Sequence, residues 1–177
     1  VLNKLEVGGR VLKTLLIRSN RIGDTAWQLY VKEDALDVEM LVRELGELAK
    51  NGEIIYSNPK SPASVITKRL YAGEHIVLED TILDVPFRYA TEGFFQINLP
   101  VYEQALKDMQ TWIAADKPVV DLYSGVGTIG LTIGGDSVTL VEINENAVRE
   151  MERNIVQLQR VPNARPVQAA SEDALDY

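Results

Sequence analysis

The spacing of apolar residues changes once along the chain, near Leu99. Before this point, short runs of alternating apolar and polar residues predict strands, and after it apolar residues recur at helical spacing between short apolar runs. The alternating part predicts a hairpin over residues 15–32, with a turn at Gly23 and Asp24. We therefore expect a small, mainly antiparallel α+β domain over residues 1–90.

The rest of this first part is predicted from local signals. Apolar positions at helical spacing predict a helix over residues 34–51 that ends at Gly52, followed by a strand over 53–56. Residues 65–98 predict several short strands, with breaks at Ala72-Gly73, Glu79-Asp80 and Val85-Pro86.

The second part alternates strands with helices. It predicts helices over residues 99–115, from about 128, and over 145–159, and strands over 119–122, 138–143 and 165–169. This order is the front half of a doubly wound parallel sheet, so the fold class is α/β. Three strands leave an exposed edge, and we therefore expect residues 91–177 to be the N-terminal part of a longer, Rossmann-like domain.

Composition excludes several kinds of site. The chain has no cysteine and one histidine, so a thiolate nucleophile and a metal site built from Cys or several His residues are excluded. No apolar run reaches membrane-spanning length, and no signal peptide precedes the first strand, so a soluble, cytoplasmic protein without membrane or metal partners is expected.

The charge is uneven along the chain. The net charge is −8, which argues against a general nucleic-acid-binding surface, with −2 over residues 1–98 and −6 over residues 99–177. A modest basic cluster runs from Lys4 to Arg21. It is consistent either with a solvated face or with a region that guides RNA.

A glycine-rich loop follows the strand at 119–122. Residues 125–130 satisfy the G-x-G-x-x-G pattern, which nicotinamide, flavin and S-adenosylmethionine sites share. Asp121 precedes this loop, and its carboxylate would repel a pyrophosphate but attract the ammonium and sulfonium of S-adenosylmethionine. Glu142 ends the next strand, where an acidic side chain can accept hydrogen bonds from both ribose hydroxyls. Asp121 favours the methyl donor over a dinucleotide, whereas Glu142 supports adenosine binding without choosing between them. The alternatives are that Asp121 is a helix cap or a buried, hydrogen-bonded acid and that Glu142 is a solvated strand end.

Three segments resemble one known family. They are GFFQIN at 93–98, DLYSGVGTIGL at 121–131 and VEINENAVREMERN at 141–154. Together they resemble the RNA uracil-5-methyltransferases that modify tRNA and 23S ribosomal RNA, closely over residues 70–177 and loosely over 1–69. On its own, the FFQIN run would favour a buried core with Gln96 at a strand edge, and the downstream motif is what favours the functional interpretation.

The resemblance implies a set of cofactor contacts. The family's glutamine corresponds to Gln96, Glu142 holds the ribose, and a position near Ala170 lies against the adenine. Ser124 replaces a common cysteine that is not the nucleophile, and Ala170 replaces a common Asp or Asn, whose role Glu172 or Asp173 could take. The residues expected to contact S-adenosyl-L-methionine are Gln96, Asp121, Tyr123, Ser124, Gly125, Gly127, Thr128, Glu142, Ile143 and Ala170.

The resemblance also implies a reaction. A cysteine thiolate adds to carbon-6 of uracil, carbon-5 then attacks the methyl group, and a carboxylate base removes the carbon-5 proton. Neither the cysteine nor the base of the family motifs lies in this chain, so we expect the full-length enzyme to methylate uridine in tRNA or rRNA while this chain alone is inactive. The alternatives are a binding-only module, a nicotinamide oxidoreductase, and a methyltransferase for protein or small molecules.

Overall fold

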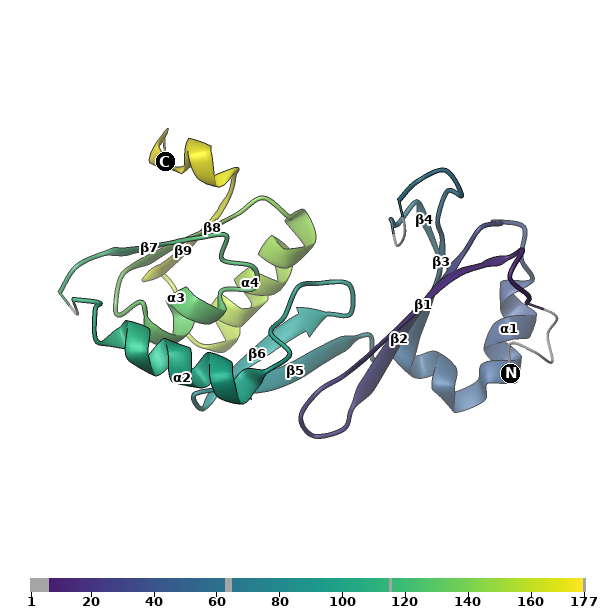
Figure 1. Cartoon of the computed structure of the whole chain (residues 1–177), viewed down its shortest axis with the longest axis horizontal. Helices are drawn as coiled ribbons and strands as arrows, with labels where there is room; N and C mark the ends of the chain where they lie inside the picture. Colours follow the sequence, from purple (N-terminus) through teal and green to yellow (C-terminus); the bar gives the residue numbers. More distant parts are fainter. Residues whose placement is uncertain (1–6, 63–64, 115, 177) are drawn as a thin grey trace. The chain divides into compact units, whose positions relative to one another are not determined.

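The computed structural model describes residues 7–62, 65–114 and 116–176 (Figure 1). By their internal contacts the residues form two compact units, 1–78 and 79–177. The predicted boundary lies at residue 90, before the period of apolar residues changes near Leu99. The contacts divide earlier because strand β6 (Val85–Ala90) packs against helix α4 (Glu145–Gln157) of the second unit. The roles assigned to the two domains stay predictions.

The first unit is a four-stranded sheet with one helical layer. Strand β1 pairs antiparallel with β2, β2 pairs parallel with β3, and β3 pairs antiparallel with β4, so the expected hairpin and the mainly antiparallel pairing are both observed. Its elements are β1 (Leu12–Ser19), β2 (Thr25–Val31), α1 (Val38–Leu45), the 3₁₀ helix η1 (Gly46–Asn51), β3 (Gly52–Tyr56) and β4 (Lys68–Ala72).

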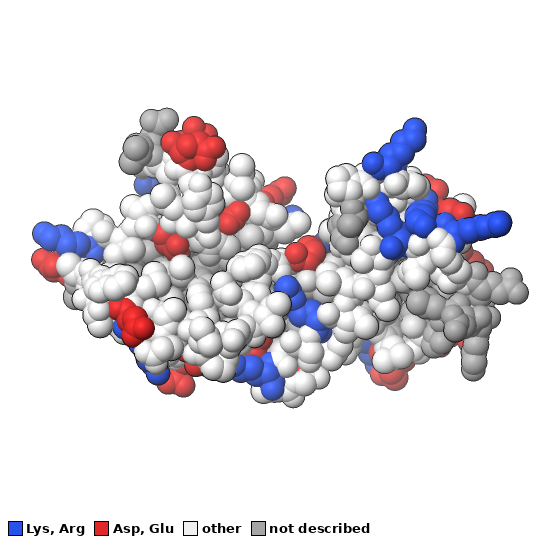
Figure 2. Space-filling model, in the orientation of Figure 1, with Lys and Arg blue, Asp and Glu red and all other residues white. Residues whose placement is uncertain are grey.

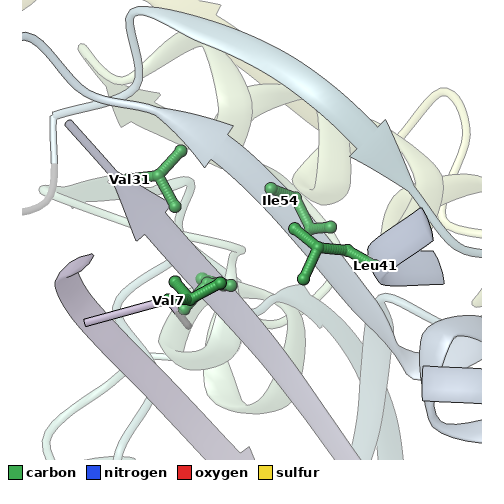
Figure 3. Packing of buried hydrophobic residues seen from close by; sticks show 5 residues of the cluster. Val7, Val31, Leu41 and Ile54 are labelled. Carbon is green, nitrogen blue, oxygen red and sulfur yellow. The ribbon is translucent and has the colours of Figure 1, made fainter. Parts of the chain in front are cut away.

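The core of this unit lies between the sheet and α1. Val31 of β2 and Ile54 of β3 pack with Leu41 of α1 and with Val7, and all four are buried (Figure 3). The α-helix is shorter than predicted: Asp37 caps its start by accepting a hydrogen bond from the Met40 amide, and it ends before Gly46, whose φ of 55° lies in the left-handed region.

A two-stranded hairpin, β5 (Val77–Ile82) and β6, follows the sheet. The predicted breaks at Glu79-Asp80 and Val85-Pro86 are wrong, because the first pair lies inside β5 and the second pair begins β6. The chain reverses at Leu83 and Asp84 instead, with φ values of 47° and 65°. Two consecutive residues with positive φ are typical of a type I′ turn, in which Asn and Gly usually occupy these positions. Leu83 and Asp84 are an unusual pair for such a turn, so the local sequence did not indicate a turn at these two positions.

The second unit contains a parallel sheet in the order β7-β8-β9, which confirms the predicted arrangement of residues 118–170 and the α/β fold class. Its elements after the hairpin are α2 (Leu99–Gln110), β7 (Val119–Leu122), α3 (Thr128–Ile133), β8 (Val138–Glu142), α4, β9 (Ala164–Gln168) and the 3₁₀ helix η2 (Ser171–Asp176).

Residues 91–98, which include the FFQIN run, form a loop rather than a strand. Phe95 is buried and stacks on Tyr89 of β6 with 3.9 Å between ring centroids, whereas Phe94 is 76% exposed. Asn98 then caps α2 by accepting a hydrogen bond from the Val101 amide. Phe95 and the buried Thr91 thus anchor the loop, whereas Phe94 and residues 96–98 are exposed.

One buried side chain joins the hairpin, α4 and the glycine-rich loop. The Asn154 amide group, which is fully buried, donates to the carbonyls of Arg88 and Val126 at 3.1 Å each, and its Oδ1 accepts from the Arg88 amide at 2.9 Å. Arg88 lies on β6, and Val126 lies in the loop between β7 and α3. Asn154 therefore fixes both segments relative to α4.

Charge is distributed differently in the two units. Residues 1–78 carry 11 basic and 10 acidic side chains (net +1), whereas residues 79–177 carry 7 and 16 (net −9). Figure 2 shows Lys and Arg side chains gathered on the part that holds β3 and β4. Within the predicted basic cluster, Lys4 lies outside the described residues, and the Lys13 ammonium donates to oxygens of Ser57, Asn58 and Ser61.

Replacing Asn154 by Leu should destabilise the chain by about 2–4 kcal/mol, because three buried backbone groups lose their partner. Chemical denaturation followed by circular dichroism measures this change. Asn163→Leu at an exposed position is the control and should change the free energy of unfolding by less than about 0.5 kcal/mol. An equally small effect at Asn154 would show that its hydrogen bonds do not hold the fold.

Candidate functional site: the loop between β7 and α3

The glycine-rich loop leaves the carboxyl end of β7 and enters α3. Three of its residues have positive φ: Tyr123 at 59°, Gly125 at 57° and Gly127 at 91°. Glycine adopts this region without steric cost, but tyrosine does so at a cost of order 1 kcal/mol. A strained backbone at the carboxyl end of a parallel strand is typical of a ligand-binding turn.

The three glycines of the motif have different roles. A Cβ atom at Gly125 would meet no atom within 4 Å, so this is where the backbone is open to a ligand. At Gly127 it would lie 2.8 Å from Leu131 Cδ1, and at Gly130 it would lie 2.5 Å from Leu140 Cδ2. These last two glycines permit the turn and the close packing of α3 on the sheet. A bulky residue at Gly127 would consequently disturb the loop itself rather than block a ligand.

Glu142, at the end of β8, holds the loop in place. Its Oε2 accepts a hydrogen bond from the Gly125 amide at 3.0 Å, and its Oε1 accepts from the Asn144 amide at 2.8 Å. The side chain is half-buried. Each carboxylate oxygen can accept more than one hydrogen bond, so Glu142 can bind the loop and two ligand hydroxyls at once.

Asp121 is buried beneath α3. Its Oδ2 accepts a hydrogen bond from the Gly130 amide at 2.8 Å, and only 7% of the residue is exposed. Burial raises the pKa of the Asp121 carboxyl, and the hydrogen bond from Gly130 opposes this effect by lowering it. The position of Asp121 therefore agrees with the alternative interpretation, a buried, hydrogen-bonded acid. That its carboxylate attracts the cofactor stays a prediction.

The other predicted contacts are placed unequally. Ser124 is buried, and its hydroxyl donates to the Val141 carbonyl at 3.1 Å, which ties the loop to β8. Tyr123 and Ile143 are exposed around the loop, at 76% and 66%, and Gln96 is exposed on the preceding loop. Ala170 is half-buried just after β9. As contacts of a cofactor, all of these residues stay predictions.

A cavity of about 190 Å³ connects this loop to the residues before FFQIN. Gly125 and Glu142 line it, together with the carboxylate side chains of Glu92 and Glu150. No Lys or Arg is among the described residues that line it. Its remaining lining residues are Ala90, Gly93, Phe94, Val126, Asn144, Asn146 and Ala147. An acidic cavity suits a cationic ligand and opposes a pyrophosphate.

A wider hollow of about 770 Å³ lies over α4 and β6 and includes Arg88, Arg149 and Arg153. These arginines pair with carboxylates of α4: Arg149 with Glu145, and Arg88 of β6 and Arg153 with Glu150. The hollow is therefore locally neutralised, and it lacks the glycine backbone of the loop. We do not place the site there.

Two residues of the site were not predicted from the sequence. Asn154 fixes the Val126 carbonyl, and Tyr102 of α2 shares a hydrogen bond with Thr128, the first residue of α3, at 2.8 Å between their oxygens. A buried Asn at an otherwise apolar helical position was the only available signal for the first, and no local signal identified the second. Among the described residues, no three His, Asp or Glu side chains are grouped as a metal site requires.

Asp121→Asn should change how stability depends on pH. The folded-state pKa of Asp121 is raised, so the folded chain binds this proton more tightly than the unfolded chain, and stability falls as pH rises from the ordinary value of 3.8 through the folded-state pKa. Asn cannot titrate, so this fall should be missing in the variant. Denaturation from pH 3 to pH 7 measures the free energy of unfolding of the unchanged chain minus that of the variant, and the contributions of the other carboxylates cancel in this difference. We expect the difference to fall as pH rises; a difference that rises with pH would refute the prediction.

No protein-family model matches the chain. An Enterococcus faecalis protein named as an uncharacterized RNA methyltransferase is 32% identical over 125 residues, which are 67% of this chain and 27% of that protein. A mouse protein named tRNA (uracil-5-)-methyltransferase homolog A is 33% identical over 87 residues, 47% of this chain and 14% of that protein. The chain thus spans about a quarter of the first of these relatives. No helix in the described residues has the length and apolar character that crossing a membrane requires.

The fold has a solved counterpart. The structure of Pyrococcus abyssi tRNA (uracil-54, C5)-methyltransferase in complex with S-adenosyl-L-homocysteine matches with a TM-score of 0.69 at 20% identity, over 90% of this chain and 40% of that one. The resemblance to RNA uracil-5-methyltransferases predicted from the sequence is thereby confirmed, and the fold is the Rossmann-like fold of S-adenosylmethionine-dependent methyltransferases.

Proposed function

We propose that the loop between β7 and α3 binds S-adenosyl-L-methionine. The observation that carries the proposal is the cavity beside Gly125, which Glu92 and Glu142 line without a basic residue among the described ones, while the Glu150 carboxylate in its wall pairs with Arg88 and Arg153. S-adenosylmethionine brings a sulfonium and an ammonium to such a cavity, whereas a nicotinamide dinucleotide brings a pyrophosphate. The names of the relatives support the same choice of cofactor class.

Different residues contact different parts of the adenosine. Glu142 accepts hydrogen bonds from the two ribose hydroxyls, because its oxygens keep lone pairs beyond those used by the Gly125 and Asn144 amides. Ile143 is exposed directly after it and offers an apolar surface to the adenine. Gly125 lets the ligand approach the backbone closely. When bound, the cofactor supplies an electrophilic methyl group on sulfur, and the protein's contribution is to bind and orient it.

For the whole protein we propose methylation of carbon-5 of uridine in RNA, with tRNA or 23S rRNA as substrate. This finer proposal rests on the sequence resemblance, above all on FFQIN before the glycine loop, and on the name of the mouse relative. The reaction needs a thiolate, and these 177 residues contain no cysteine. We therefore propose that this chain is the cofactor-binding part of the enzyme.

Glu142→Ala should weaken the binding of S-adenosylhomocysteine at least about tenfold, because it removes two charge-assisted hydrogen bonds of about 1.5–3 kcal/mol each. Isothermal titration calorimetry measures the dissociation constant. Glu152→Ala, at an exposed position on α4, is the matched control and should bind like the unchanged chain. Binding of NADH without binding of S-adenosylhomocysteine would overturn the proposal in favour of an oxidoreductase.

The chain alone should transfer no methyl group to RNA, because it has no thiol to add to carbon-6 of uracil. Incubation with tritiated S-adenosylmethionine and an RNA hairpin that contains uridine, followed by scintillation counting of the RNA, tests this expectation. Incorporation of label into carbon-5 of uridine would rule out the thiolate mechanism for this chain.

A further inference from the structure

Helix α2 brings a side-chain hydroxyl to the glycine-rich loop from a segment distant in the sequence. Tyr102 lies in the first turn of α2, where its amide donates to the Asn98 carbonyl at 3.0 Å. Its hydroxyl oxygen lies 2.8 Å from Thr128 Oγ1. Thr128 directly follows Gly127 and begins α3, and α2 packs against α3. The contact is therefore built into the packing of the two helices.

The two hydroxyls leave one hydrogen unused. Each hydroxyl has one hydrogen to donate, and the bond between Tyr102 and Thr128 uses one of the two. Burial raises the pKa of Tyr102, the hydrogen bond with Thr128 lowers it, and the nearby Asp121 carboxylate raises it. Tyr102 therefore stays protonated at neutral pH, and the pair can donate its second hydrogen to a third group. Both residues are half-buried, so each keeps part of its surface exposed.

The position of Tyr102 and Thr128 indicates which part of the ligand accepts this second hydrogen. Glu142, at the end of β8, contacts the loop at Gly125, whereas Thr128 lies at the far end of the loop, above β7 and its buried Asp121. A cofactor whose ribose is bound by Glu142 then directs its amino-acid end toward the Thr128 end of the loop. That end carries an ammonium, which the Asp121 carboxylate attracts, and a carboxylate, which accepts hydrogen bonds.

We propose that Tyr102 is a positioning residue for the amino-acid end of the cofactor: it orients the Thr128 hydroxyl so that the hydrogen left over by the pair is donated to the cofactor's α-carboxylate. The inference rests on the proposed binding of S-adenosylmethionine. It adds a residue from α2, outside the glycine motif. It also places the ribose of the cofactor at the Gly125 end of the loop and the amino-acid group at the Thr128 end.

The test compares two ligands that differ only at that end. S-adenosylhomocysteine carries the amino-acid group, and 5′-methylthioadenosine lacks it. Tyr102→Phe keeps the ring and removes the hydroxyl, so it should weaken S-adenosylhomocysteine about three- to tenfold by calorimetry and leave methylthioadenosine within about twofold. Thr128→Val should give the same pattern. Because the two hydroxyls act as a pair, the double variant should bind little worse than either single variant.

The controls separate this inference from the proposed function. Tyr71→Phe, on β4 in the first unit, should leave both affinities unchanged, and thermal unfolding confirms that each variant is folded. An equal loss for both ligands, or unchanged affinity for S-adenosylhomocysteine in folded Tyr102→Phe and Thr128→Val, would overturn the role of Tyr102 while cofactor binding stands. If the unchanged chain binds neither ligand, the proposed function fails and the inference fails with it.

Discussion

The amide group of Asn154 is the interaction on which the arrangement of the second unit depends. It is fully buried, and each hydrogen bond that it makes goes to backbone: both Arg88 groups on β6 and the Val126 carbonyl in the glycine-rich loop. Without a partner, these buried groups would each cost about 1–3 kcal/mol. One side chain on α4 thus fixes the hairpin and the loop together, and the segment that follows β6 leads directly into FFQIN.

The loop itself is held in a conformation that it would not adopt alone. Positive φ at Tyr123 costs free energy, which the surrounding hydrogen bonds offset. Ser124 bonds to the Val141 carbonyl through both its amide and its hydroxyl, and Glu142 accepts from the Gly125 amide. All three bonds lead to β8. The strand that presents the ribose-binding acid therefore also shapes the backbone that the adenosine approaches, so that the site is organised before any ligand arrives.

Electrostatics favours one class of ligand for this site. The second unit carries a net charge of −9, and the carboxylates of Glu92 and Glu142 line the cavity beside Gly125, together with Glu150, which pairs with Arg88 and Arg153. Asp121 adds another acid beneath α3, where burial raises its pKa. An ammonium or sulfonium is attracted to such a region, and a polyanion such as RNA or a pyrophosphate is repelled. The more basic first unit, with net +1, is the part of the chain less opposed to RNA.

The amino-acid sequence was sufficient to predict the periodic elements of the second unit and the glycine-rich loop. The three parallel strands, the helix that begins at Thr128 and the acid at the end of β8 follow from apolar period and from local motifs, because both depend on neighbours a few residues apart. Local signals failed where the chain used unusual residues, as at the Leu83-Asp84 turn, and where Gly46 ended α1 early.

Only the tertiary structure decided which distant residues meet. Tyr102 and Thr128 are 26 positions apart, and Asn154 and Arg88 are 66 apart, so no period or spacing could pair them. The structure also gives the Asp121 carboxylate a hydrogen bond from Gly130 and the Ser124 hydroxyl a bond to Val141, while their predicted contacts with the cofactor stay predictions. The partners of a side chain depend on how the helices pack on the sheet. A sequence pattern predicts only whether a side chain is buried or exposed, and not which other side chains it contacts.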